Sequence, residues 1–266
     1  MRSYLRKSEI YKIFVINWLQ YFFNTKISVK FGANNDTKIS VKNNIKNSIM
    51  IYTIGGIKGG SGKTTIATNL AIWLAQKGTD VLLVDADEQE TATDFSSWRE
   101  QNVGDGMGYT SIKLTGESVR TQVTKLKTKY EHIVIDTGGR DTTSQRAALV
   151  ISDYYLVPFN PRSFDIWTVY KVQNLVGEIR AVKSGPLNVY TFLNRADPRG
   201  ADNDEAAEIL MQCEGMNYIP NPLGNRKAFS HAAGKGLGVV ELNPPDEKAS
   251  TELNNLFTYI FSNSTN

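Results

Sequence analysis

The sequence predicts an α/β fold, a doubly wound and mostly parallel sheet flanked by helices, formed as a single domain by residues 50–266. Short apolar runs alternate there with segments long enough for helices. Runs such as VLLVD and IVID are apolar up to their closing aspartate, which is typical of strands covered on both faces. No linker rich in Pro, Gly or Ser divides this part of the chain. Ligands of such sheets bind beyond the carboxyl ends of the strands, so functional residues are expected there.

The expected elements follow from this alternation. The strands are the short apolar runs Met50–Ile54, Val81–Asp85, Ile133–Asp136, Tyr154–Pro158, Leu187–Leu193 and Tyr218–Ile219. The helices are the longer segments Lys63–Lys77, Thr91–Gln101, Glu117–Lys129, Arg140–Ile151, Ser163–Val182, Asn203–Gln212, Arg226–Ala233 and Glu247–Phe261. Helices between successive strands act as crossover connections, which favours parallel pairing.

Composition limits the kinds of site that this chain can hold. It has 30 Lys and Arg residues, 27 Asp and Glu residues and one cysteine, Cys213. One cysteine excludes a disulfide framework and any all-protein CxxC zinc or iron–sulfur site, and it fits the reducing cytoplasm. Basic residues are concentrated in residues 1–49, which leaves residues 50–266 slightly acidic. Nucleic-acid binding by this part would therefore need a local basic patch.

The first 49 residues differ from the rest. The apolar stretch Ile10–Phe23 is shorter than the roughly 20 residues that a membrane-spanning helix needs, and Lys12, Asn17 and Gln20 interrupt it. An interfacial amphipathic helix is the open alternative for this stretch.

The hexapeptide TKISVK occurs at Thr25–Lys30 and again at Thr37–Lys42. Two copies are too few for a repeat fold, which needs about three stacked units. Read as DNA, the two copies of the hexapeptide form a direct repeat of the kind found in operators. Met50 follows them in the sequence and is the first residue of the first expected strand. We therefore expect Met50 to be the physiological start and residues 1–49 to be a leader that is disordered or not part of the physiological protein. The alternative is a genuine, disordered N-terminal arm.

A glycine-rich loop joins the first expected strand to the first helix. It reads GGIKGGSGKTT over Gly55–Thr65. Its glycines let successive backbone N–H groups point at the phosphates of a nucleotide, and the helix N-terminus adds its dipole. Lys63 supplies a mobile positive charge for the β- and γ-phosphates, and the Thr64 hydroxyl can bind Mg²⁺. The general phosphate-loop pattern requires glycine where this chain has Ile57, and the next residue is Lys58.

The order K-G-G-S-G-K-T-T, from Lys58 to Thr65, resembles the deviant Walker A motif of the ParA/MinD family of P-loop ATPases, most closely the small plasmid-partition ParA type. The resemblance extends from Met50 almost to the C-terminus. It implies the P-loop NTPase fold, with ATP and Mg²⁺ as cofactors, and a signature lysine, Lys58, that reaches the nucleotide of the partner in a homodimer. The residues that it assigns to nucleotide binding are Lys58, Gly59, Gly60, Ser61, Gly62, Lys63, Thr64, Thr65 and Asn194.

Carboxylates follow two of the expected strands. The segment Val81–Asp87 resembles the family's Walker A′ segment, with Gln89 matching and Glu88 in place of the usual proline. By this resemblance Asp87 orients the attacking water and Asp85 supports the metal shell. The implied catalytic residues are Lys58, Lys63 and Asp87.

The segment His132–Gly139 resembles the Walker B segment, which ends in two prolines in many relatives. By this resemblance Asp136 binds Mg²⁺ through water and Thr137 senses the γ-phosphate. Gly138 and Gly139 replace the prolines and make this turn more flexible. The implied metal ligands are Thr64, Asp85 and Asp136.

Two later segments also match the family. Asn194 stands where family members place an amide that pairs with adenine, although a turn-capping role is the alternative. The segment Ile219–Glu241 matches a family pattern at Arg226, Phe229, Ala232, Gly236, Val239 and Glu241.

The resemblance implies an ATPase for DNA partition, in plasmid or chromosome segregation. ATP would drive formation of a sandwich homodimer that binds DNA non-specifically, and a small centromere-binding, ParB-like protein would stimulate a weak hydrolysis that releases it. Such a protein would be cytoplasmic and nucleoid-associated, without stable membrane association. Candidate DNA contacts, none carried over individually, are Lys171, Arg180, Lys183, Arg199, Arg226 and Lys227.

Other functions fit less well. A MinD-like membrane-cycling ATPase would need a C-terminal amphipathic helix with a basic face, but Asp246–Phe261 offers only Lys248. The nitrogenase iron protein needs cluster cysteines in each subunit, and dethiobiotin-synthetase-like ligases lack a lysine at the position of Lys58. A conjugation-associated positioning ATPase for another cargo is the alternative that the sequence does not separate from partition.

Overall fold

The computed structural model describes residues 26–31, 37–42, 49–104, 106–163, 166–197 and 200–262. The chain divides into two units, Met1–Ser48 and Ile49–Asn266. In the first unit, β1 (Lys26–Phe31) and β2 (Thr37–Lys42) pair antiparallel, with Ser28 opposite Ser40. The repeated hexapeptide therefore supplies both strands of a hairpin. The stretch Ile10–Phe23 lies outside the described residues, and the start at Met50 stays a prediction.

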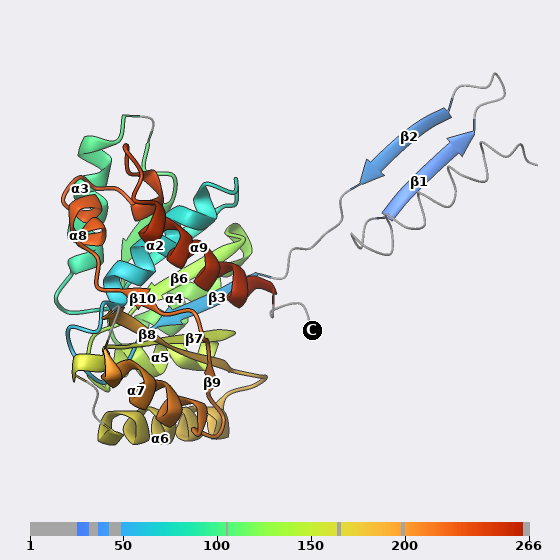
Figure 1. Ribbon diagram of the computed structural model, residues 1–266. Coiled ribbons are helices and arrows are strands. Elements are labelled where there is room, and N and C mark those ends of the chain that lie inside the picture. Colours follow the sequence, from blue (N-terminus) through green and yellow to red (C-terminus); the bar gives the residue numbers. More distant parts are fainter. Residues whose placement is uncertain are drawn as a thin grey trace, which may run out of the picture. The chain divides into compact units, whose positions relative to one another are not determined.

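The second unit is built on one sheet in which every pairing is parallel. Its strand order is β10-β8-β7-β3-β6-β4-β5, and β9 also pairs with β8 (Figure 1). The strands are β3 (Met50–Ile54), β4 (Val81–Asp85), β5 (Thr110–Lys113), β6 (His132–Asp136), β7 (Tyr154–Phe159), β8 (Asn188–Ala196), β9 (Asn217–Tyr218) and β10 (Leu223–Gly224). The predicted fold class is thereby confirmed.

The helices lie where the sequence predicts them. They are α2 (Lys63–Ala75), α3 (Thr91–Asn102), α4 (Ser118–Leu126), α5 (Thr143–Ile151), α6 (Ile166–Val182), α7 (Ala201–Met211), α8 (Lys227–Ala233) and α9 (Glu247–Ser262), with short 3₁₀ turns at Lys127–Lys129, Pro161–Ser163 and Val239–Glu241. Among the described residues, none of the helices combines the length and the apolar character that a membrane span requires.

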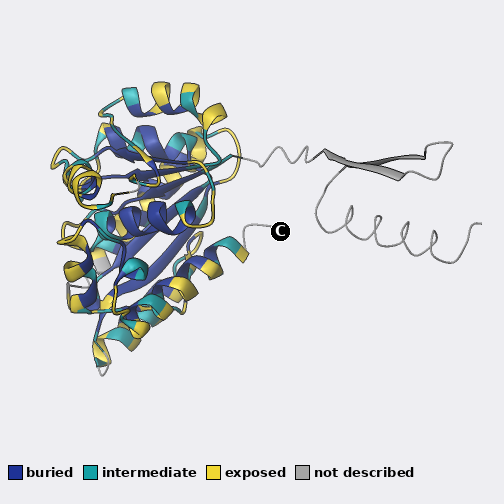
Figure 2. Ribbon diagram, turned by 90° about the horizontal axis from the view of Figure 1, so that it is seen from above, coloured by how far each residue is buried: buried dark blue, intermediate teal, exposed yellow. Residues whose placement is uncertain are grey.

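Helices cover both faces of the sheet, which explains why its strands are apolar throughout. Alternate side chains of a strand point to opposite faces. Tyr52 and Ile54 of β3 belong to a core shared with α2, α8 and α9, whereas Ile51 packs with α4 and α5. Figure 2 shows the resulting buried strands in the centre and exposed residues on the outer sides of the helices.

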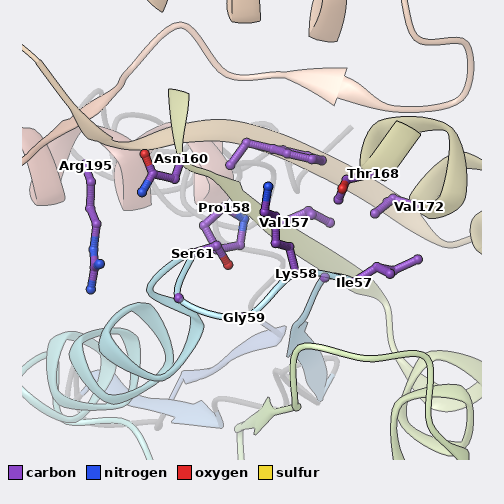
Figure 3. Close-up of a pocket in the computed structure, with 13 residues that line it drawn as sticks. Ile57, Lys58, Gly59, Ser61, Val157, Pro158, Asn160, Thr168, Val172 and Arg195 are labelled. Carbon is purple, nitrogen blue, oxygen red and sulfur yellow. The ribbon is translucent and has the colours of Figure 1, made fainter. Parts of the chain in front are cut away.

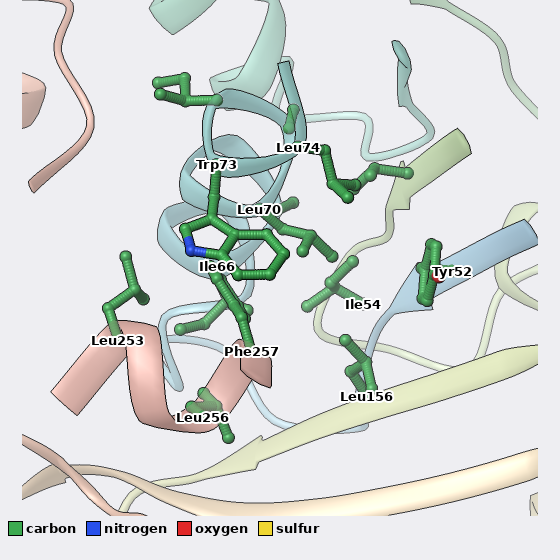
Figure 4. Packing of buried hydrophobic residues seen from close by; sticks show 14 of the residues in the cluster. Tyr52, Ile54, Ile66, Leu70, Trp73, Leu74, Leu156, Leu253, Leu256 and Phe257 are labelled. Carbon is green, nitrogen blue, oxygen red and sulfur yellow. The ribbon is translucent and has the colours of Figure 1, made fainter. Parts of the chain in front are cut away.

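Helix α9 closes the core over α2. The rings of Trp73 in α2 and Phe257 in α9 meet edge to face, with centroids 5.4 Å apart (Figure 4). The Trp73 indole N–H also donates to Asn254 Oδ1 at 2.8 Å, so its one polar atom is satisfied inside the contact. The apolar residues of α9 are therefore used inside the domain.

A buried ion pair joins α3 to the segment that follows α8. The Arg99 guanidinium donates to both carboxylate oxygens of Glu241, at 2.7 and 2.9 Å, and to the carbonyls of Met107 and Gly236, at 2.8 and 2.9 Å. The Arg99 side chain is 5% exposed and that of Glu241 is 17% exposed. Gly238 N donates to Glu241 as well, at 2.8 Å. With so many partners satisfied, both charges tolerate burial.

We predict that Glu241→Gln lowers the free energy of unfolding by about 3 kcal/mol, because it leaves the buried Arg99 charge without its counterion. The matched control is Glu178→Gln, whose carboxylate pairs with Arg146 on the surface. That change should cost less than about 1 kcal/mol. Urea denaturation of both variants measures the difference, and equal small losses would contradict a structural role for the buried pair.

Candidate functional site

The phosphate loop spans Gly55–Gly62, between the end of β3 and the start of α2. Gly60 and Gly62 have φ angles of 76° and 91°, a region that side-chain-bearing residues rarely adopt. The base of the loop is fixed because Gly55 N donates to Leu156 O at 3.1 Å and the Thr137 hydroxyl donates to Ile54 O at 3.0 Å. Thr137, predicted to sense the γ-phosphate, is thus fully buried beneath the loop in this structure.

The two lysines of the loop occupy different environments. Lys63 is 6% exposed, and its Nζ donates to the Lys58 carbonyl at 3.1 Å across the inside of the loop. Burial lowers the pKa of Lys63, while Asp136 and Asp87 act to raise it. The Lys58 side chain is exposed. One lysine therefore lies inside the loop and the other on its outer surface.

A cavity of about 630 Å³, here called the phosphate cavity, lies beyond the carboxyl ends of β3, β4 and β6. Seven predicted site residues line it, namely Gly59, Gly60, Gly62, Lys63, Thr64, Thr65 and Asp87. The cavity is also lined by residues that the sequence did not assign to the site, including Thr91, Arg140, Thr142, Ser144 and Arg195. The structure thus brings the loop and Asp87, the predicted catalytic aspartate, to one cavity.

Asp136 is fully buried at the end of β6, beside this cavity. Neither of its carboxylate oxygens makes a hydrogen bond of ordinary geometry with a described residue. Burial raises its pKa to about 8, Asp85 and Asp87 add to the rise, and the nearby Thr64 hydroxyl and Lys63 ammonium oppose it. A buried carboxylate without donors has unused capacity for a cation or its water shell.

The donor set suits magnesium that is held together with phosphates. No group of three or more His, Cys, Asp and Glu side chains in the described residues could hold a metal ion by itself. Mg²⁺ commonly binds through one or two carboxylates plus substrate phosphates and waters. Asp136 and the Thr64 hydroxyl, predicted to be ligands, fit that kind of site.

Asp85, predicted to support the metal shell, accepts hydrogen bonds from neighbouring protein groups in this structure. Its Oδ2 accepts hydrogen bonds from Thr93 N at 2.7 Å and from the Thr93 hydroxyl at 2.8 Å. Its Oδ1 accepts from Asp87 N at 3.1 Å. These bonds fix the turn that carries Asp87 and the first turn of α3. The geometry gives Asp85 a positioning role, which the sequence did not indicate because its partner Thr93 belongs to no motif.

The glycine pair after β6 allows a close approach that proline would prevent. A Cβ atom at Gly138 would lie 3.0 Å from Asp87 Oδ1, and one at Gly139 would lie 2.7 Å from Gly59 N. The turn therefore lies close to both Asp87 and the phosphate loop. Here the glycines provide space as well as flexibility.

A second cavity, here called the side cavity, has a volume of about 580 Å³. It is lined by Thr65, Asn194, Arg195, Gly224, Asn225, Arg226, Lys227, Phe229, Ser230 and Ala233. Asn194 donates from its amide to Ser61 O at 2.7 Å and so holds the phosphate loop, while its contact with adenine stays a prediction. Arg226, a candidate DNA contact, is instead paired with both carboxylate oxygens of Glu252.

A third cavity, here called the rear cavity, measures about 270 Å³ and lies between the phosphate loop, the end of β7 and α6 (Figure 3). Lys58, Ser61, Asn160, Thr168 and Arg195 contribute its polar groups. Lys58 lines this cavity and not the phosphate cavity.

Asp136 makes the stability of the ligand-free protein depend on pH. A carboxyl group with a higher pKa in the folded state favours folding while it is protonated, and this stability is lost as the pH rises from its usual value of 3.8 toward about 8. Asp136→Asn cannot ionise, so we predict that it unfolds at a higher temperature than the unsubstituted chain at pH 8, with little difference at pH 4. Thermal unfolding without nucleotide or Mg²⁺ measures this. A variant with no gain at pH 8 would contradict the cost of the buried charge.

Comparisons with known proteins agree with this geometry. The CobQ/CobB/MinD/ParA nucleotide binding domain matches residues 52–239. The maintenance of carboxysome distribution protein A of Halothiobacillus neapolitanus is 25% identical over 80% of this chain and 97% of its own length. The protein ParA of Rhizobium radiobacter is 24% identical over 68% of this chain and 80% of its own length. A putative plasmid partition protein from Borrelia burgdorferi, solved with AMPPNP, has a TM-score of 0.63 at 20% identity and covers 81% of this chain and 100% of its own. Because the match spans well over half of the sequence and includes the phosphate loop, the chain belongs to the CobQ/CobB/MinD/ParA family of nucleotide-binding domains.

Proposed function

We propose that this chain is a DNA-partition ATPase that forms an ATP-sandwich homodimer, binds DNA non-specifically in that state and is released when a ParB-like partner stimulates hydrolysis. The observation that carries the proposal is the division between the two loop lysines. Lys63 is buried against its own phosphate cavity, whereas Lys58 is exposed and lines a different cavity. A lysine that faces away from its own phosphates is placed to serve the nucleotide of a partner.

The groups of the phosphate cavity have separable tasks. The loop N–H groups, the N-terminus of α2 and the Lys63 ammonium hold the phosphates. Asp136 and the Thr64 hydroxyl would hold Mg²⁺, which neutralises charge on the phosphates. Asp87, half-buried at the cavity wall, accepts a hydrogen bond from the attacking water and orients it. Asp85 keeps Asp87 in place through its bonds to the turn.

The base would occupy the side cavity. Thr65 and Arg195 line both the phosphate cavity and the side cavity, so the two adjoin each other. The side cavity extends from the loop to the end of β8 and the segment after β10, where polar groups of Asn194 and Asn225 can meet a base edge.

The structure disfavours a MinD-like membrane role for α9. Leu253, Leu256, Phe257 and Ile260 are fully buried in the core, so the apolar side of α9 is not available to a lipid surface. Among the candidate DNA contacts, Lys171 is exposed on α6, whereas Arg180 donates to Leu187 O at 2.8 Å. Arg199 lies outside the described residues.

Positioning of a cargo other than a plasmid is the second candidate. The relative named for carboxysome distribution favours it, because it covers most of this chain at the same level of identity as the partition relative. Both candidates share the ATP-dependent dimer and differ in the partner, so a co-purified partner that binds DNA would support partition.

Paired lysine variants test the division of labour. We predict that Lys63→Ala weakens ATP binding about a hundredfold or more, because it removes the buried cation of the phosphate cavity. Lys58→Ala should keep ATP binding and lose the ATP-dependent doubling of mass. Calorimetric titration with ATP and Mg²⁺ measures the first effect, and light scattering measures the second. Lys125→Ala, an exposed lysine on α4, is the matched control and should change neither.

A Lys63→Ala protein that binds ATP normally would show that the loop does not hold the phosphates. A Lys58→Ala protein that still dimerises with ATP would contradict the sandwich arrangement and leave nucleotide binding intact.

A further inference from the structure

Arg195 occupies an unusual place in the sheet. Leu223 and Gly224 of β10 pair with Asn194 and Ala196 of β8, so Arg195 is an extra residue on β8 without a paired partner on β10. Its φ angle is 59°, in the left-handed region, which among the described residues other than glycine only Glu90 shares. Bulges of this kind redirect side chains and occur beside active sites.

This conformation costs free energy that the Arg195 side chain does not recover through contacts with the described residues. An L-residue other than Asn or Asp is strained in the left-handed region. The guanidinium is exposed and makes no hydrogen bond or ion pair with any residue that the structure describes. A glycine would adopt the same backbone without strain. The arginine is therefore unexplained by the stability of the fold.

The position of Arg195 supplies an explanation. It lines the phosphate cavity, the side cavity and the rear cavity. Figure 3 shows its side chain extending alongside the phosphate loop. A nucleotide with its outer phosphates at Lys63 and its base in the side cavity would have its ribose and α-phosphate between the loop end at Thr65 and Arg195.

We propose that Arg195 is a nucleotide-binding residue whose guanidinium contacts the α-phosphate, at the junction of the phosphate and side cavities. This inference rests on the proposed nucleotide-binding function. The planar fork of arginine matches two phosphate oxygens, and the exposed guanidinium donates to none of the residues that the structure describes. Lys63 contacts the β- and γ-phosphates from the buried side of the loop. Arg195 would therefore balance the charge of the α-phosphate and Lys63 that of the outer phosphates.

Arg195→Gly separates binding from stability. The variant removes the guanidinium and relieves the backbone, so its unfolding temperature without nucleotide should equal or exceed that of the unsubstituted chain. Its affinity for both ATP and ADP should fall by about tenfold or more, because both nucleotides carry the α-phosphate. Arg195→Lys should recover part of the affinity. Arg120→Ala, an exposed arginine on α4, is the control and should bind as the unsubstituted chain does.

Calorimetric titration with Mg·ATP and Mg·ADP and thermal unfolding of the full chain supply both readouts. Equal affinity in Arg195→Gly would overturn the inference, and so would early unfolding of that variant, because it would give the side chain a structural role. If the unsubstituted chain itself binds neither nucleotide, the proposed function fails instead.

Discussion

Parallel pairing of β3, β6 and β4 determines where the chemistry of this protein is located. The register places Asp136 opposite Ile54 on one side and opposite Asp85 on the other, so three strands end at the same level. Each end carries one functional element, namely the phosphate loop, the buried carboxylate and the turn with Asp87. Asp85 and Asp136 are fully buried at these strand ends, and the ammonium of Lys63 acts on the charge of Asp136. The site is thus a consequence of sheet register.

Several unfavourable local features lie around this edge. Neither carboxylate oxygen of the buried Asp136 has a hydrogen-bond partner of ordinary geometry among the described residues, and Glu90 and Arg195 have left-handed backbones. Buried polar atoms without such a partner also occur away from this edge, at the Tyr52 hydroxyl and His132 Nδ1, whereas the Arg99–Glu241 pair is well satisfied. Natural proteins tend to keep strain and unsatisfied groups where a ligand uses them. The buried carboxylate of Asp136 and the strained backbone of Arg195 therefore support a binding site at this edge independently of the motif.

Much of the fold follows from the sequence because the central strands are covered on both faces. β3 and β4 have the predicted bounds, and β6 and β7 differ by one residue. β5 was missed since its residues are only partly buried and carry no continuous apolar signal, and β10 is too short to give one. The helix predicted to begin at Arg140 begins at Thr143, because the Thr142 hydroxyl accepts a hydrogen bond from Gln145 N and caps the helix there.

The phosphate loop was predictable because its chemistry requires a contiguous motif. The contacts of Asp85 with Thr93 and of Asn194 with Ser61 join distant segments, and the bulge at Arg195 depends on pairing with β10, so none could be predicted from local pattern.

In the function that we propose, the nucleotide state controls non-specific binding to DNA. The most direct measurement is retention of the full chain on a DNA duplex of arbitrary sequence with Mg·ATP, with Mg·ADP and without nucleotide, at low and high salt. We expect retention with Mg·ATP alone, and a steep loss of retention with salt because phosphate contacts release counterions. Retention without nucleotide, or binding confined to one sequence, would contradict it.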